Sequence, residues 1–180
     1  MTRPSIRRTL PAAIAATALG LTTLSAVGAQ AAETESSTAS MTCVLKVEGK
    51  IDPPIDLVTK KPANFNGKGG TAACEGTIGG ETVDTTELGS WGVNADTDEP
   101  INCASLASGF TGTGTSSIAV TTVDGQKKTH TTTFSFQIAG GLVVVSGGLE
   151  GTATFQPTEG DCQNTPVKRA LVEFAVKTKT

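Results

Sequence analysis

Apolar and polar residues alternate along much of the chain after residue 40, which is the two-residue period of strands with one buried face. Residues 129–139 show this pattern most clearly. One face of this segment holds His130, Thr132, Phe134, Phe136 and Ile138, and the other holds Thr131, Thr133, Ser135 and Gln137. The alternation predicts a strand that is buried on its phenylalanine side.

Short glycine turns divide the surrounding sequence, residues 117–155, into strands. Asp124-Gly125, Gly140-Gly141 and Gly147-Gly148 supply the residues that adopt positive φ in tight hairpin turns. These three turns predict four consecutive antiparallel strands. The same alternation marks a first strand at residues 41–51 and a last one across residues 170–177, which gives about eight strands and no helix beyond the N-terminal segment.

Other residues mark the expected ends of strands. Pro53 and Pro54 cannot donate to a ladder, so they are expected to end the first strand. A weaker strand is expected at residues 82–92, followed by a long acidic loop at residues 94–104.

Glycines spaced by two, Gly67 and Gly69 and again Gly112 and Gly114, leave one face of a strand without side chains. Such gaps are typical of strong curvature or close packing, and a bulge or bend is expected at Gly69-Gly70. A phosphate-binding loop is the alternative, but it requires a following helix, and no helical period follows either pair. The structural interpretation is therefore favoured.

An even number of consecutive antiparallel strands predicts an all-β domain whose last strand runs antiparallel to its first. If these two strands pair, the sheet closes into an up-and-down barrel and leaves no edge strand. A two-sheet β-sandwich built from the same strands is the alternative, and the pattern leaves both open.

The N-terminal segment has the composition of a secretory signal peptide. Residues 1–8 carry three arginines and no acid, residues 11–27 are apolar and alanine-rich, and Ala29-Gln30-Ala31 has the small residues that a signal peptidase requires. We expect cleavage after Ala31, a flexible lead at residues 32–40 and a single β domain at residues 41–180. The mature protein is expected to be secreted, and no second apolar run is long enough to span a bilayer.

Loss of the signal peptide changes the charge of the chain. Without its three arginines, 11 of the 14 basic residues face 17 acidic ones, a net charge of −6. That balance argues against nucleic acid and anionic membranes as partners, because both bind basic surfaces. The sequence shows no cofactor motif, and no feature of it indicates a specific partner.

Four cysteines, Cys43, Cys74, Cys103 and Cys162, are expected to form two disulfides, since an even number in an exported chain is typical of structural bridges. Their wide spacing argues against the clustered ligands of a zinc site. Four cysteines allow three pairings. In an up-and-down arrangement Cys43 and Cys74 lie at one end of the strands and Cys103 and Cys162 at the other, so these two pairs are favoured.

Five segments resemble a pattern of small exported proteins of high-GC Gram-positive bacteria to which no activity is assigned. The segments are TCVLKVEG, FNGKGGTAAC, GFTGTGTSS, LVVVSGGLEGTATF and GDCQNTPV. The resemblance covers most of the chain after residue 40 and rests on glycine, threonine and cysteine spacing. It implies a secreted all-β domain and carries no functional residue to this chain.

The aromatic side chains of such a barrel have two interpretations. They can fill the interior as a core, or they can surround a cavity that holds a small apolar ligand. The candidate lining residues are Trp91, Phe110, Phe134, Phe136, Phe155 and Phe174. A packed core is the favoured interpretation, and Trp91 is expected to cap that core rather than to stack on a ligand.

Candidates for chemistry are sparse. Asp96, Asp98 and Glu99 supply the oxygen ligands that calcium takes, although a solvated acidic loop is the favoured interpretation. His130 is the only histidine. No nucleophile motif accompanies it, so a surface or half-buried position without a catalytic role is expected.

A non-enzymatic, secreted binding module is therefore the expected function, with a small apolar ligand or a partner surface as its target. One alternative is a secreted hydrolase, since carboxylates are plentiful. The other is a structural or cell-surface protein whose threonine-rich strand faces contact a cell-envelope polymer or a partner protein.

Overall fold

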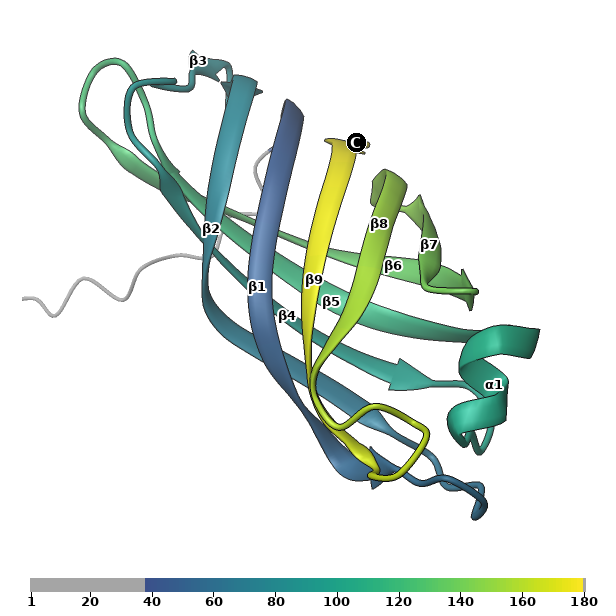
Figure 1. The fold of residues 1–180 in the computed structure, drawn as a ribbon. Coiled ribbons are helices and arrows are strands. Elements are labelled where there is room, and N and C mark those ends of the chain that lie inside the picture. Colours follow the sequence, from purple (N-terminus) through teal and green to yellow (C-terminus); the bar gives the residue numbers. More distant parts are fainter. Residues whose placement is uncertain (1–37, 180) are drawn as a thin grey trace, which may run out of the picture. The chain divides into compact units, whose positions relative to one another are not determined.

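The structure is a computed structural model that describes residues 38–179, so the predicted signal peptide and most of the predicted lead lie outside the described residues. Within that range the chain forms one antiparallel sheet and one short helix (Figure 1). The strands are β1 (Ala39–Ile55), β2 (Asn64–Ile78), β3 (Glu81–Thr82), β4 (Gly89–Thr97), β5 (Phe110–Thr121), β6 (Lys127–Ala139), β7 (Leu142–Gly147), β8 (Leu149–Glu159) and β9 (Val167–Thr178). The helix is α1 (Cys103–Ser108).

The sheet closes on itself because β1 pairs with both β2 and β9. Cys43, for example, lies opposite Cys74 on one side and Val176 on the other. The other strands follow one another around the ring in sequence order, and β3 adds only two residues beside the end of β2. The predicted all-β, up-and-down arrangement is confirmed in this closed form, in which the last strand pairs with the first, and the two-sheet alternative is not adopted.

The ring has two ends, which differ in their connections. The helix end carries the β1–β2, β4–β5, β6–β7 and β8–β9 connections together with α1 (Figure 1). The opposite end carries the β2–β4, β5–β6 and β7–β8 connections, and we call it the tryptophan end because Trp91 lies near the start of β4. Both predicted disulfides are present: Cys43–Cys74 joins neighbouring strands towards the tryptophan end, and Cys103–Cys162 lies at the helix end.

The predicted alternation places the interior correctly. In β6 the side chains of His130, Phe134 and Ile138 are buried and the intervening odd-numbered residues are exposed. In β9 the even-numbered residues from Ala170 to Val176 are likewise buried and face the interior. These inward side chains form one continuous hydrophobic core within the ring.

The first strand is longer than predicted. It begins at Ala39, inside the predicted lead, and continues through Pro53 and Pro54 to Ile55. Its pairing with β2 stops at Asp52, and its pairing with β9 is interrupted between Lys50 and Ile55. The prolines therefore lie where no ladder hydrogen bond is required of them, which is why they do not end the strand.

The predicted bounds of the strand at residues 82–92 were wrong. It is divided into β3 and β4 by a turn in which the Asp84 carboxylate accepts hydrogen bonds from the N–H and the hydroxyl of Thr86. β4 then continues to Thr97, through the first part of the predicted acidic loop. That continuation was hidden because Asn94 and Asp96, which resemble loop residues, face outward from the strand.

The expectation of no further helix was also wrong. Asn102 caps α1: its side-chain oxygen accepts from the N–H of Ser105, and the Ser105 hydroxyl accepts from the N–H of Asn102. This reciprocal arrangement is a capping box. A helix of six residues is too short to show a helical period in the sequence.

Glycine marks a bulge in one part of the sheet and allows close packing in another. The register of β2 against β4 shifts between Gly67 and Gly70, and Gly69 has a φ of +69°, as expected for a bulge. Gly112 and Gly114 lie opposite Phe136 and Phe134 on β6.

Side chains at these two positions would collide with their neighbours. A Cβ on Gly112 would overlap the Asp96 carbonyl oxygen and the Phe136 ring, and one on Gly114 would lie 2.7 Å from the Phe134 ring. The two rings thus lie across positions that have no side chain.

Candidate functional site

An apolar cavity lies inside the ring at the helix end and is partly open to solvent. The volume open to the centre of a water-sized sphere is about 60 Å³. The cavity therefore holds more than one water-sized group, since a space that only just fits one such sphere leaves its centre almost no volume. The cavity is therefore small but large enough to hold a compact group.

All six phenylalanines of the chain line this cavity. They are Phe65, Phe110, Phe134, Phe136, Phe155 and Phe174. The rest of the wall is aliphatic apart from two polar side chains: Ile51, Ile55, Ala63, Val93, Ala95, Ile101, Ile138, Val143 and Val172, with Asn64 and Thr97. The phenylalanines of the domain are thus concentrated in one place.

The six rings form two groups by depth. Phe110, Phe134 and Phe174 are buried. Phe65, Phe136 and Phe155 are only partly buried, and they come from β2, β6 and β8, on different sides of the ring. The partly buried group provides aromatic surface that is accessible from solvent at the cavity.

Contacts between the rings, mostly edge to face, hold them in place. The Phe110 and Phe136 centroids lie 6.3 Å apart in a T-shaped arrangement, and Phe134 lies 6.3 Å from both Phe136 and Phe174. Phe174 in turn meets Trp91 edge-on at 5.0 Å. These separations fall within the favourable range for aromatic pairs, so the wall is ordered by its own contacts.

The two polar side chains in the wall are engaged with the protein. The Thr97 hydroxyl accepts a hydrogen bond of 3.1 Å from the N–H of Ala63. The Asn64 amide donates to the Asp96 carboxylate at 2.8 Å and to the Asn94 side-chain oxygen at 3.0 Å, on the outer face of the sheet. The cavity therefore presents a hydrocarbon wall to any occupant.

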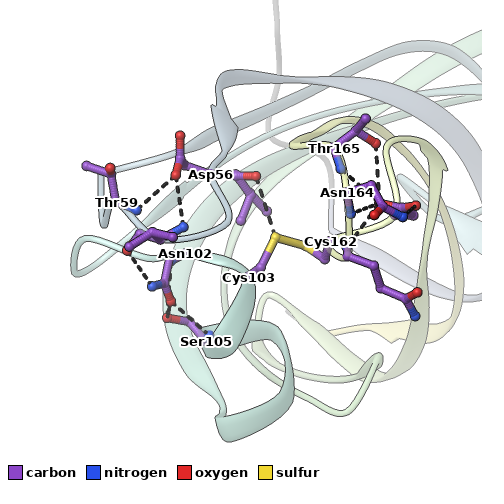
Figure 2. The surroundings of a disulfide bond; sticks show 12 residues. Asp56, Thr59, Asn102, Cys103, Ser105, Cys162, Asn164 and Thr165 are labelled. Carbon is purple, nitrogen blue, oxygen red and sulfur yellow. Dashed lines mark hydrogen bonds between the residues drawn. A yellow bond between two sulfur atoms is a disulfide. The ribbon is translucent and has the colours of Figure 1, made fainter.

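The Cys103–Cys162 disulfide fastens the segments beside the cavity (Figure 2). It joins the start of α1 to the β8–β9 loop, and neither segment pairs with the other through a strand ladder. The N–H of Cys103 also donates to the Asp56 carbonyl at 2.9 Å, and the Asn102 amide donates to the Val58 carbonyl at 2.8 Å. Three connections at the helix end are thereby tied together.

Two ionised carboxylates shape these connections. The Asp161 carboxylate accepts from the N–H groups of Asn164, Gln163 and Thr165, and these bonds lower the pKa of Asp161 well below its ordinary value. Backbone hydrogen bonds likewise lower the pKa of Asp56, through Val58 first and Thr59 second (Figure 2). Both loops are therefore ordered by a charged acceptor at their centre.

The structure brings five of the six candidate lining residues together and separates the sixth. Trp91 is 1% exposed and does not line the cavity, and its indole N–H donates to the Ser116 hydroxyl at 2.9 Å. Phe65 was missed. The glycines that follow it interrupt the alternation, so the pattern does not predict that its ring lines the cavity, opposite Ile51 in the β1–β2 ladder.

The calcium candidates are not gathered into a site. Asp96 accepts from Asn64, Asp98 accepts from the Thr111 hydroxyl at 2.7 Å, and Glu99 is exposed. Across residues 38–179, no group of three or more histidine, cysteine, aspartate or glutamate side chains could hold a metal ion.

His130 lies deeper than expected. It is 5% exposed rather than at the surface or half-buried, because its even-numbered position in β6 directs it into the ring opposite Ile118. It lies beyond the residues that line the cavity.

Comparisons with protein-family models, curated proteins and solved structures return no match to the chain. Among the described residues, no helix is long and apolar enough to cross a membrane.

Proposed function

We propose that this protein is a secreted, non-enzymatic binding module that takes up a compact apolar molecule, or the apolar end of a larger amphiphile, in the cavity at the helix end. The observation that carries the proposal is the convergence of all six phenylalanines on one partly open cavity. A core that only stabilised the fold would have no reason to leave space among its largest side chains, because unfilled volume is destabilising.

The wall determines the chemical class of the ligand. Burial of hydrocarbon against it is favourable by about 25 cal/mol for each Å² removed from water. A hydroxyl or charged group inside would lose its hydrogen bonds to water, because Asn64 and Thr97 are already engaged with protein groups. The buried part of the ligand is therefore a hydrocarbon.

The volume determines its size. An engineered apolar cavity of about 150 Å³ in another protein stays dry and binds benzene or xenon. The present cavity is smaller on its own measure, about 60 Å³, but it is partly open. A phenyl ring or a short branched chain therefore fits with part of its surface at the opening, and a polar remainder extends past Phe65, Phe136 and Phe155 into solvent.

The location is part of the proposal. Two disulfides favour an oxidising compartment, and the basic, apolar and small-residue regions of residues 1–31 favour export. N-terminal sequencing of the protein recovered from culture medium is expected to begin at Ala32. Recovery of the uncleaved chain from the cytoplasm alone would contradict this part.

Binding is tested by nuclear magnetic resonance titration with benzene, and with phenol as its hydroxylated counterpart. Benzene is expected to give saturable shifts confined to the helix end, with weaker binding of phenol. Val143→Phe is expected to abolish the benzene shifts, because the added ring occupies space beside Phe136 and Ile138.

Val44→Phe is the matched control, since Val44 is 60% exposed on the outer face of β1. This variant is expected to bind benzene as the unmodified protein does. Absence of saturable shifts in the unmodified protein, or unchanged binding by folded Val143→Phe, would contradict the proposal.

A further inference from the structure

Strand β6 is longer than its neighbour on one side. β5 pairs with it along residues 127–138, whereas β7 reaches only residues 134–139. Residues 127–133, at the tryptophan end, therefore have a strand neighbour on one side only within the described chain. We call these seven residues the β6 edge.

The backbone of this edge faces outward at alternate residues. The Thr133 carbonyl accepts from the N–H of Gly148 at 3.0 Å, so odd-numbered residues of β6 direct their backbone groups away from β5. In an antiparallel strand the N–H and C=O of one residue point to the same side, and the side alternates. Thr129 and Thr131 thus present their N–H and C=O groups at the open edge, where no backbone partner is found among residues 38–179.

An open edge of this kind binds another strand unless it is guarded, commonly by lysine. Two lysines begin the β6 edge, but only one of them can shield it. The Lys128 ammonium is drawn into an ion pair with the Glu81 carboxylate at 2.6 Å and is largely covered. The middle of the edge carries only threonine on its outer face.

We propose that the β6 edge pairs antiparallel with the β6 edge of a second copy of this chain, about a two-fold axis at His130. This register places Thr129 opposite Thr131 of the second copy, and Thr131 opposite its Thr129. Both residues direct their backbone groups outward, so the two pairs form four N–H···O=C hydrogen bonds. The sheets of the two copies then become continuous.

The boundaries of the edge favour a second copy as its occupant. The β5–β6 turn lies at one end of the edge, and the Gly147-Gly148 turn lies at the other. A two-fold axis at the central residue uses the seven residues fully and carries neither copy past a boundary. It also sets Lys127 opposite Thr133 of the second copy, so that no like charges face each other across the pair.

The test is sedimentation of the mature protein from about 1 µM to about 1 mM, the range expected of a small interface. A monomer–dimer equilibrium is expected. Thr131→Pro is expected to weaken it at least about tenfold, since proline removes an outward N–H and is tolerated at an edge position that β5 does not use. Thr131→Val keeps the N–H and is expected to dimerise normally.

Hydrogen exchange provides a readout that does not depend on the variants. Exchange at the Thr129 and Thr131 amides of the unmodified protein is expected to slow as its concentration rises, while exchange at the helix end stays constant. A monomer across the whole range, or a dimer without slower exchange at these amides, would overturn the proposal. The experiment concerns the tryptophan end, so its outcome is separate from ligand binding at the helix end.

Discussion

The two ends of the ring are built from the same strands but are filled differently. At the tryptophan end the Trp91 indole, Ile78, Ile118 and Leu149 are fully buried, and the indole N–H is satisfied by Ser116. At the helix end six phenylalanines surround a cavity. Aliphatic side chains and the indole fill the tryptophan end. At the helix end, the Phe136 and Phe134 rings lie across Gly112 and Gly114 and form part of the wall around the cavity.

The two disulfides differ in the same way. Cys43–Cys74 joins residues that already lie opposite each other in the β1–β2 ladder. Cys103–Cys162 closes a longer stretch of chain, with a separation of 59 residues rather than 31, and joins segments that share no ladder. Cys43–Cys74 therefore reinforces a pair of strands that the ladder already holds together. Cys103–Cys162 holds together two segments beside the cavity that no ladder connects.

The largest expected effect separates the two ends by truncation. Trp91→Ala is expected to lower the free energy of unfolding by about 3–5 kcal/mol, since it leaves a large void and an unpaired Ser116. Phe155→Ala is expected to lower it by only about 1–2 kcal/mol, because that ring is partly exposed beside existing space. Urea denaturation measures both, and equal losses would contradict the contrast.

The disulfides are compared next by replacing each pair with serine. Either double variant is expected to lose about 2–4 kcal/mol of stability through greater freedom of the unfolded chain. Only Cys103→Ser/Cys162→Ser is expected to accelerate hydrogen exchange around α1 under native conditions. Faster exchange around α1 in Cys43→Ser/Cys74→Ser as well would show that the second bridge has no special role at the cavity.

A smaller effect comes from adding one methylene at a residue that lines the cavity and one at a buried residue that does not. Val143 lines the cavity, whereas Val145, on the same face of β7, does not. Val143→Ile is expected to stabilise the protein by about 0.5–1 kcal/mol by filling space, and Val145→Ile to destabilise it by about 1 kcal/mol by overpacking. Thermal unfolding of both variants checks this, and a loss of stability at both positions would mean that the cavity offers Val143→Ile no free space.

The smallest effect concerns pH at the helix end. A carboxyl group whose pKa is lowered by folding stabilises the fold above its unfolded pKa, about 4, and that contribution is lost as the pH falls through the lower folded value. Asp161→Asn is therefore expected to unfold at a lower temperature than the unmodified protein at pH 6, with the difference shrinking as the pH falls below about 4. Glu99→Gln is the exposed control, and a difference that does not change with pH would contradict the role of the charge.

The arrangement of strands could be predicted because it depends on local pattern. The alternation of His130, Phe134 and Ile138 gives the buried face of a strand without knowledge of its neighbours. Counting hairpin turns then gives the direction of each strand, and direction was enough to favour Cys43–Cys74 and Cys103–Cys162.

The cavity could not be predicted in the same way, since it depends on the volumes of side chains that meet from distant strands. The same pattern allowed Phe134 and Phe174 to fill a core or to line a space. Phe65 was hidden by the glycines after it, and the end of β4 was hidden by outward-facing Asn94 and Asp96. These features follow from packing across the ring rather than from the order of residues along a strand.

A crystal structure of the protein under xenon pressure tests the central claim most directly, because xenon enters apolar space and requires no hydrogen bond. The account predicts a xenon atom at the helix end, in contact with Phe110, Phe134 and Phe174, and none beside Trp91. An empty helix end, or equal occupancy beside Trp91, would contradict it.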